Sequence, residues 1–365
     1  MEKTLSKINN IPVRTWKWLG VNNISIEKSL PEVVPYNAEY VSEVEEAGIR
    51  VSNLSKNLSS EFNMSDYAGI DESSIDEAKN NYNAGVFVHA SEYKKYDKPI
   101  FINYALNEKN NTLIDNNIII AEEGSEVTVV INYSSDNGIS AAHNGLTQVY
   151  AKKNAVVNLI KLQTLSENVL HLDAHGVKTE ENAVVNYTAV DLGASHAVIN
   201  YTDDLLGFKS SSNIYSIYLG DKNRVIDINY LINHHGKNTT STVETRGALM
   251  DNSKKTFRGT LDFKKGCKKA KGQEEEYTIL LSPHVVNKTV PILLATEEDV
   301  DGQHAASAGR IDENKLFYIM SRGFSETEAK KLVIEAAFNP IIKNIPSEEI
   351  RDKISSSIRR KLENE

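Results

Sequence analysis

A short phrase recurs along the middle of the chain: a polar turn containing Gly or Asn, then a strand in which apolar and polar residues alternate. The turn residues of its five copies are Gly124, Asn154, Asn182, Asn223 and Asn252. The gaps between them are 30, 28, 41 and 29 residues, and the long gap contains a half-phrase beginning at Leu192. A repeat of this size predicts a solenoid or a propeller, in which each unit buries its apolar face by stacking on the next.

The repeat unit favours a β-helix over the other repeat architectures. No unit contains a second helix, which excludes ankyrin-like and other helical repeats, and no Trp-Asp blade signature is present. Residues two apart on a strand share one face. We predict that the inward face carries Val127 and Val129, Val157 and Leu159, Val185 and Tyr187, and Ile226 and Ile228. A two-layer β-sandwich is the structural alternative.

Changes in the pattern of apolar and polar residues divide the chain into three segments. Residues 1–90 form a mixed, α-rich segment, residues 91–310 the β-helix core, and residues 311–365 a helical segment. Within the first, EYVSEVEEAGI (39–49) predicts a short amphipathic helix ending at Gly48, and 65–80 predicts a loop or weak helix.

The last segment predicts three helices. Ser325 and Glu328 form a capping box that opens the second. The predicted apolar faces are Leu316, Phe317, Ile319 and Met320 in the first helix, Leu332, Val333, Ala336 and Ala337 in the second, and Ile350, Ile354, Ile358 and Leu362 in the third. The narrow stripe of the third helix favours packing on its own domain, with partner binding as the alternative.

Composition excludes several functional classes. The 365 residues include 41 Lys and Arg against 50 Asp and Glu, a net charge of -9 that argues against nucleic acid as the main partner. A single cysteine cannot form a disulfide framework or an all-cysteine metal site within one chain. No apolar run has the length of a signal peptide or a membrane helix, so we expect a cytoplasmic protein without a membrane partner.

Motifs for common catalytic chemistries are absent from the sequence. There is no P-loop, no Gly-x-Ser-x-Gly elbow and no His-Glu-x-x-His. Cys267 lies among five lysines within eight positions, which could lower its pKa and make it reactive, but an exposed charged loop with an incidental thiol is the favoured interpretation.

Two groups of histidines are candidate ligands. His171, Asp173 and His175 are spaced by two, so on a strand they would share one face and could bind iron or zinc; a solvent-facing polar strand is the favoured alternative. His304 lies between the β region and the C-terminal helices and is followed by small residues that leave its imidazole accessible. From spacing alone, a structural histidine is the better interpretation of His304.

The sequence around His304 also carries a family resemblance. Residues 274–338, with Pro291 on a strand, HAAS from His304, LFY from Leu316 and SRG from Ser321, resemble the SufB/SufD scaffold family of the SUF iron–sulfur cluster assembly system. The resemblance runs more loosely back through HHGKNTTS from His234 and the repeats. It implies a right-handed parallel β-helix in a cytoplasmic complex with a SufC-type ATPase, which binds through the C-terminal helices.

The departures from the family pattern point to a SufD-type subunit. By the resemblance, a SufB-type subunit has an essential cysteine 28 residues before the histidine and a glutamate directly after it, where this chain has Glu276 and Ala305. His304 matches the histidine that a SufD-type subunit contributes to the cluster-forming interface. The resemblance also implies that Phe317, Tyr318, Arg322 and Gly323 dock the ATPase.

The resulting expectation is a non-catalytic scaffold subunit. It would pair with a SufB-type subunit, receive sulfur indirectly from a donor system, and hold a transient iron–sulfur cluster or iron at the subunit interface, with none bound stably by this chain alone. Two alternatives remain: a SufB-like homodimeric scaffold with the ATPase, and a polysaccharide-processing β-helix enzyme.

Overall fold

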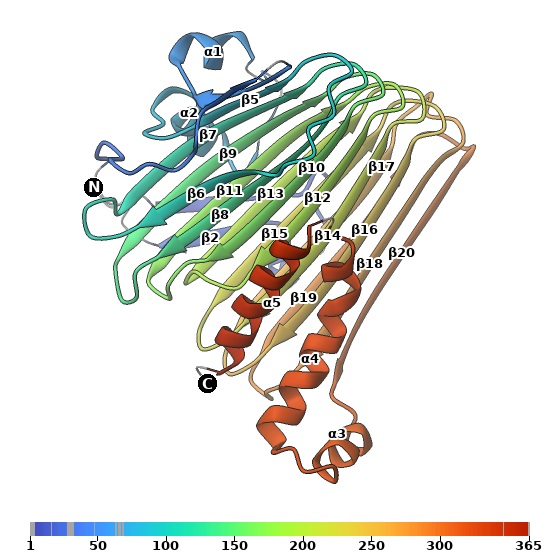
Figure 1. Ribbon diagram of the computed structural model, residues 1–365. Helices are drawn as coiled ribbons and strands as arrows, with labels where there is room; N and C mark the ends of the chain where they lie inside the picture. The colour runs from blue at the N-terminus through green and yellow to red at the C-terminus, as the bar shows by residue number, and fades with distance from the viewer. Residues whose placement is uncertain are drawn as a thin grey trace.

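The centre of the protein is a parallel β-solenoid, in which successive strands alternate between two facing sheets (Figure 1). This computed structural model describes residues 4–363 except 16, 28–32, 47, 63, 65–66, 68 and 346. Sheet I has the strand order β20-β18-β16-β14-β12-β10-β8-β6, and sheet II has the order β19-β17-β15-β13-β11-β9-β7-β5-β4-β3. Neighbouring coils pair in parallel. The predicted β-helix is confirmed and the sandwich alternative is wrong, because sandwich sheets are antiparallel.

The strands account for most of the ordered structure. Their bounds are β1 (Thr4–Ile8), β2 (Ile24–Glu27), β3 (Val44–Glu46), β4 (Ile49–Asn53), β5 (Val86–Ala90), β6 (Ile100–Leu106), β7 (Thr112–Ala121), β8 (Glu126–Ser135), β9 (Ala141–Ala151), β10 (Val156–Thr164), β11 (Val169–Thr179), β12 (Val184–Asp191), β13 (His196–Leu205), β14 (Ser211–Gly220), β15 (Val225–His234), β16 (Thr240–Leu249), β17 (Lys254–Phe263), β18 (Ala270–Leu280), β19 (Val286–Ala295) and β20 (Val300–Arg310). The helices are η1 (Lys17–Leu19), α1 (Lys56–Glu61), α2 (Glu72–Asn80), α3 (Glu313–Met320), α4 (Glu326–Lys343) and α5 (Glu348–Glu363).

The solenoid explains the uneven spacing of the sequence repeat. The first three phrases form β8, β10 and β12, which are consecutive strands of sheet I, whereas the last two form β15 and β17 of sheet II. The 41-residue gap between Asn182 and Asn223 therefore spans about one and a half coils. The half-phrase within it is β13.

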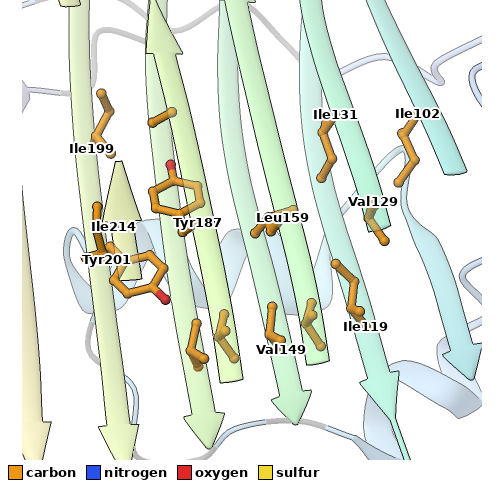
Figure 2. Packing of buried hydrophobic residues seen from close by; sticks show 14 of the residues in the cluster. Ile102, Ile119, Val129, Ile131, Val149, Leu159, Tyr187, Ile199, Tyr201 and Ile214 are labelled. Carbon is orange, nitrogen blue, oxygen red and sulfur yellow. The ribbon is translucent and has the colours of Figure 1, made fainter. Parts of the chain in front are cut away.

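The predicted inward residues form the core between the sheets (Figure 2). All eight are at most 1% exposed. Apolar residues of neighbouring strands stack along the solenoid axis, as Ile119 does on Val149 and Ile199 on Ile228, and they belong to the same core. Ile119, Val149 and Ile199 are labelled in Figure 2. Each coil thus buries its apolar face only because another coil covers it.

One row of turns has a left-handed backbone in successive coils. Gly124, Asn154 and Asn182 have φ values of 67°, 58° and 54°, which glycine and asparagine adopt at low cost. The N–H of Asn154 donates to the carbonyl of Glu181 at 2.8 Å, and equivalent bonds join the following turns. The recurrent Gly or Asn in the sequence phrase therefore reflects a backbone requirement of the turn.

The helix predicted over 39–49 is wrong. Val44–Glu46 and Ile49–Asn53 form an antiparallel hairpin, β3 and β4, around Gly48, whose φ is 87°. Because β4 also pairs with β5, it adds backbone hydrogen bonds to sheet II and buries Ile49 and Val51. Strand pairing thus overrides a weak helical pattern. The weak helix predicted within 65–80 is present as α2, capped by the side chain of Asp71.

The helices α4 and α5 cover the outer face of sheet I (Figure 1). The stripe from Ile350 to Leu362 is buried there, and the capping box of Ser325 and Glu328 is present. The predicted face of α4 is partly wrong, because Leu332 is 40% exposed while Ile334 and Phe338 are buried. The helix docks on the sheet through positions slightly farther along the chain than the sequence predicts.

Candidate ligand site at the open end of the solenoid

The last coil leaves two long strand edges open. β19 pairs with β17 and β20 with β18, and within the described residues neither strand has a partner on its other side. Residues 303–308 of β20 are all exposed, and Figure 1 shows β20 as the outermost strand of its sheet. Unpaired edges of this length are templates for pairing with another chain.

His304 lies on β20 at this open end. It is in register with Glu274 of β18, and partners in adjacent parallel strands point to the same face. The side chain of Glu274 is buried, which places that face toward the solenoid interior. His304 itself is exposed, because no further coil covers it in this chain. The predicted accessibility of its imidazole is therefore confirmed.

Glu276 stands beside this position in a dense polar cluster. Its Oε1 accepts from Nζ of Lys255 at 2.6 Å and from the hydroxyl of Tyr218 at 2.9 Å, and its Oε2 accepts from Thr289 at 2.5 Å. Burial lowers the pKa of Lys255, although Glu276 opposes this effect. The carboxylate is thus one half of a buried ion pair, at the position where the resemblance implies a cysteine in a SufB-type subunit.

Glu274 differs from Glu276 in its partners. Burial and the charge of Glu276 raise the pKa of Glu274 to about 8. Its Oε2 has no hydrogen-bond partner among the described residues. Its carboxyl lies over Gly259 of β17, where an added Cβ would be 2.1 Å from Oε1. Glycine at that position leaves the space that the carboxyl fills.

Cys267 is not the exposed thiol that the sequence predicts. It lies in the turn before β18 and is fully buried in the core between the sheets. Burial raises its pKa, and Glu297 and Asp262 raise it further. The alternative, in which neighbouring lysines lower the pKa, is also wrong, because the thiol enters the core while the lysines stay outside it.

The candidate metal ligands on β11 do share a face, but that face is the interior. His171, Asp173 and His175 are each at most 3% exposed, so the solvent-facing interpretation is wrong. Nε2 of His175 lies 3.3 Å from Oδ2 of Asp173, and Nζ of Lys161 donates to Oδ1 at 2.7 Å.

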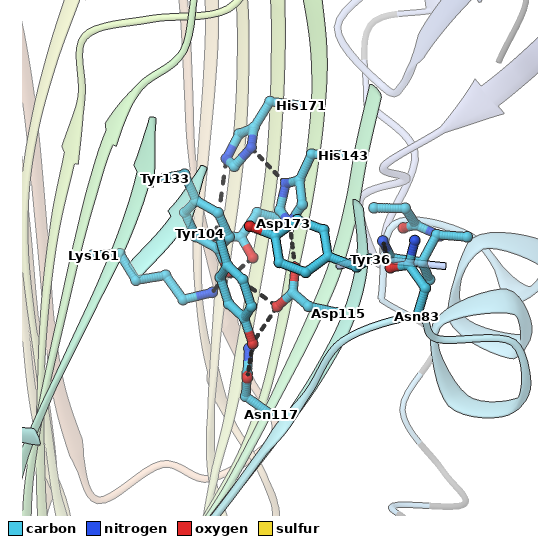
Figure 3. A network of polar contacts seen from close by, with 12 residues as sticks. Tyr36, Asn83, Tyr104, Asp115, Asn117, Tyr133, His143, Lys161, His171 and Asp173 are labelled. Atoms are coloured by element: carbon cyan, nitrogen blue, oxygen red, sulfur yellow. Dashed lines mark hydrogen bonds and ion pairs between the residues drawn. The ribbon is translucent and has the colours of Figure 1, made fainter. Parts of the chain in front are cut away.

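This set belongs to a larger sealed cluster (Figure 3). Nδ1 of His171 lies 2.7 Å from Nδ1 of His143, whose Nε2 lies 2.5 Å from Oδ1 of Asp115. The hydroxyl of Tyr133 donates to the other carboxylate oxygen of Asp115 at 3.1 Å. The ring of His143 fits because its neighbour in the interior is Gly145, where a Cβ would lie 2.7 Å from it.

Burial governs the protonation of the sealed cluster. It lowers the pKa of His171, as does the neighbouring His143. For Asp173, burial alone would raise the pKa, but His175 and Lys161 hold it well below the usual value. In the part of the chain that the structure describes, no group of three or more His, Cys, Asp or Glu side chains is arranged to hold a metal ion. The imidazoles are engaged in hydrogen bonds instead.

Sequence reasoning missed most of this cluster and the ion pair of Lys255. Asp115, His143 and His171 follow one another at 28-residue intervals, which is the length of one coil. That spacing could have identified them as interior neighbours. The sealed cluster and His304 are separate sites: from Lys161 on β10 to β20 there are five strand spacings, or about 24 Å.

The proposed docking residues of the C-terminal segment lie on and just after α3. The side chains of Phe317 and Tyr318 are 73% and 60% exposed, and α3 has no buried residue. The guanidinium of Arg322 donates to the hydroxyl of Tyr318 at 3.0 Å, and Gly323 turns the chain at φ 98°. Figure 1 shows α3 projecting beyond the solenoid, away from α5.

In the described part of the chain, no helix combines the length and the apolar character of a membrane span.

Comparison with known proteins places these features in a family. The SufBD core domain of the SUF system for FeS cluster assembly matches residues 104–337. The chain is 28% identical over 283 residues to the iron–sulfur cluster assembly protein SufD of Bacillus subtilis, covering 77% of this chain and 64% of the relative. It is 26% identical over 268 residues to a SufBD family protein of Staphylococcus saprophyticus, covering 73% and 58%.

A SufBD family protein of Staphylococcus epidermidis is 26% identical over 359 residues, covering 95% of this chain and 75% of that protein. The chain thus spans somewhat less than two thirds of the length of the first two relatives. The matched domain contains most of the solenoid, the open end with His304, and α3. The chain belongs to the SufBD core family of the SUF iron–sulfur cluster assembly system.

Proposed function

We propose that this chain is a non-catalytic scaffold subunit for iron–sulfur cluster assembly, which pairs with a SufB-type subunit through its open solenoid end and binds a SufC-type ATPase through α3. The observation that carries the proposal is the pair of open edges, β19 and β20, with His304 on the inward face of the last coil. A second solenoid end placed there would extend both sheets and enclose the imidazole between two chains.

The cargo of the site would be iron and sulfide, held at the interface for the time of assembly. This chain offers an imidazole but no accessible thiolate, because Cys267 is buried and Glu276 stands where the SufB-type subunit has its cysteine. Thiolates therefore have to come from the partner. Sulfur would arrive indirectly, from a donor that acts on the partner.

The ATPase would dock on the exposed surface of Phe317, Tyr318, Arg322 and Gly323. Exposed aromatic and arginine side chains are the residue types that dominate binding energy at protein interfaces. Because α4 connects α3 to the face of sheet I, movement of the docked ATPase would be transmitted to the solenoid. For this coupling, the ATPase must bind the open and closed states of the scaffold pair with different affinity. ATP hydrolysis belongs to the partner; neither nucleic acid nor a membrane is part of the proposal.

The proposal is tested by co-expressing this chain with a SufB-type subunit and the ATPase from the same source. Anaerobic purification and light scattering on a sizing column give the mass of the complex, and iron and sulfide are then assayed. We expect one copy of each scaffold subunit, two ATPase subunits, and uptake of both iron and sulfide.

A homodimer of this chain with two ATPase subunits would favour the homodimeric scaffold instead. A chain that ignores both partners would refute the proposal and return attention to a polysaccharide-processing enzyme, for which calcium-dependent lyase activity would be measured.

A further inference from the structure

One carboxyl at the open end is unexplained by packing or by ion pairing. Glu274 is 2% exposed, yet its Oε2 has no hydrogen-bond partner among the residues described. Its neighbour Glu276 shows what a satisfied carboxylate looks like here, with Lys255, Tyr218 and Thr289 around it. A buried oxygen left without a partner costs about 1–3 kcal/mol. The free oxygen can accept a ligand that is present only in another state of the protein, and the exposed His304 beside it is a second possible donor to that ligand.

The position of Glu274 identifies where that ligand would sit. Glu274 and His304 are register partners on β18 and β20, and both point to the interior face. Adjacent strands are about 4.8 Å apart, so an oxygen of Glu274, which releases its proton to solvent when the cation binds, and an imidazole nitrogen can both reach one ion between them. Gly259 supplies room on the opposite sheet, where any larger residue would displace the carboxyl.

We propose that Glu274 and His304 together form a half-site for a divalent transition-metal cation, with ferrous iron as its ligand in the cell. Carboxylate and imidazole in combination suit iron in the +2 state, and the same pair accepts cobalt as a spectroscopic substitute. The other coordination positions are filled by water in the isolated chain and by side chains of the opposing subunit in a complex.

The identity of the ligand in the cell rests on the proposed function. The half-site adds Glu274 to the residues that would serve that function. The sequence resemblance directs attention to His304 alone, whereas the structure assigns a second ligand that is not exposed. Glu274 would hold iron at the mouth of the interior, so that the metal is anchored from below by the carboxylate and from the rim by the imidazole. This arrangement would place iron at the interface before sulfide and thiolates complete a cluster.

The test is titration of the full chain with Co²⁺, followed by visible absorption and by calorimetry. We expect one Co²⁺ per chain, with E274Q and H304A each weakening binding at least tenfold. The matched control is E275Q: Glu275 is the next residue on β18, but it points to the outer face and pairs with Arg246 at 3.2 Å. E275Q should bind Co²⁺ like the parent chain.

Glutamine keeps the shape of Glu274, and His304 is exposed, so the two variants probe the site with little risk of unfolding; circular dichroism checks this. Unchanged Co²⁺ affinity in E274Q overturns the half-site, as does the absence of saturable binding by the parent chain both alone and in the complex.

The outcomes separate this inference from the proposed function. If the complex with the SufB-type subunit forms and loads iron equally with E274Q, the half-site is wrong and the scaffold function stands. If Co²⁺ binding depends on Glu274 but the chain ignores the SufB-type subunit and the ATPase, the half-site stands and the scaffold function fails.

Discussion

Two polar clusters lie inside the same solenoid, and they differ in how many of their polar groups have hydrogen-bond or ion-pair partners. In the sealed cluster around His143, coils on both sides exclude solvent, and the carboxylates of Asp115 and Asp173 have close cationic or hydrogen-bonding partners. At the open end, Glu276 is paired but Glu274 is not, and His304 faces solvent. In the sealed cluster, the buried polar groups bind one another, which is consistent with a structural role. At the open end, Glu274 and His304 remain able to bind a ligand.

The largest expected effect is on the sealed cluster. H143A removes the imidazole beside the buried Asp115 carboxylate and leaves a cavity in the interior, although Tyr133 still donates to that carboxylate. Loss of one member of a buried pair costs about 3–5 kcal/mol. Urea unfolding at pH 7 should show a loss of this size. The control H235A removes an imidazole whose side chain is 40% exposed and should cost about 1 kcal/mol or less. Equal effects of the two variants would contradict the distinction between sealed and exposed histidines.

A somewhat smaller loss is expected for K255M at the open end. The variant leaves Glu276 buried without its cation, and Tyr218 and Thr289 still donate to the carboxylate. Methionine, unlike the alanine of H143A, fills most of the space of the side chain that it replaces, so no large cavity adds to the loss. We expect a loss of about 2–4 kcal/mol in the same unfolding assay. A loss larger than that of H143A would show that the open end, not the sealed interior, depends more on its charges.

A pH-dependent gain is expected for D191N. Burial, with a contribution from Asp173, raises the pKa of Asp191 in the sealed interior to about 8 from a usual value of 3.8. The protonated acid therefore stabilises the fold below pH 4, and this contribution is lost as the pH rises toward 8. Asparagine mimics the neutral acid, so D191N should be more stable than the parent by about 1–3 kcal/mol at pH 8 and equally stable at pH 4.

The free energy of unfolding also depends on pH through His171, and in the opposite direction. The lowered pKa of His171 means that the unfolded chain takes up its proton first as the pH falls below 6.5. That contribution to stability is present above this pH and declines below it. Unfolding measured from pH 4 to 8 in the parent and D191N would separate the two contributions; parallel profiles would mean that Asp191 is ionised in the folded state.

The smallest effect on stability is expected on α3. The double variant F317A/Y318A removes exposed rings and should change the unfolding free energy by about 0.5 kcal/mol or less. Affinity for the SufC-type ATPase should nevertheless fall at least tenfold in calorimetry. The control is L332A, which changes an exposed apolar residue on α4 outside the docking surface. It should leave ATPase binding unchanged.

The solenoid was predictable because its apolar pattern repeats in the sequence, as Val127, Val157 and Val185 illustrate. The β3–β4 hairpin was not, since its pairing with β5 is a tertiary interaction that a local pattern does not contain. At the candidate site, His304 was found by resemblance and its exposure follows from its place at the end of the repeat. Glu274 was missed although it precedes His304 by 30 residues, about one coil, because the strands and their register were not placed exactly enough from the sequence to use that spacing.

Cys267 and the histidines of β11 were predicted to be exposed and are buried. Local charge predicts an exposed thiol, and local polarity predicts a solvent-facing strand. The alternation of β11 directs the histidines into the core, and the turn before β18 does the same for Cys267. A sequence window shows which residues are polar. It does not show that a coil before and a coil after will bury them.

The sealed cluster has a consequence for how the chain avoids misfolding. The coils present similar apolar patterns, so a strand that slipped by two residues would keep its apolar face inward. Such a slip would separate His143 from His171 and from Asp115, leaving a buried carboxylate without its partner. The histidines therefore penalise incorrect alignment of the early coils, and the coils that follow inherit the correct alignment from them.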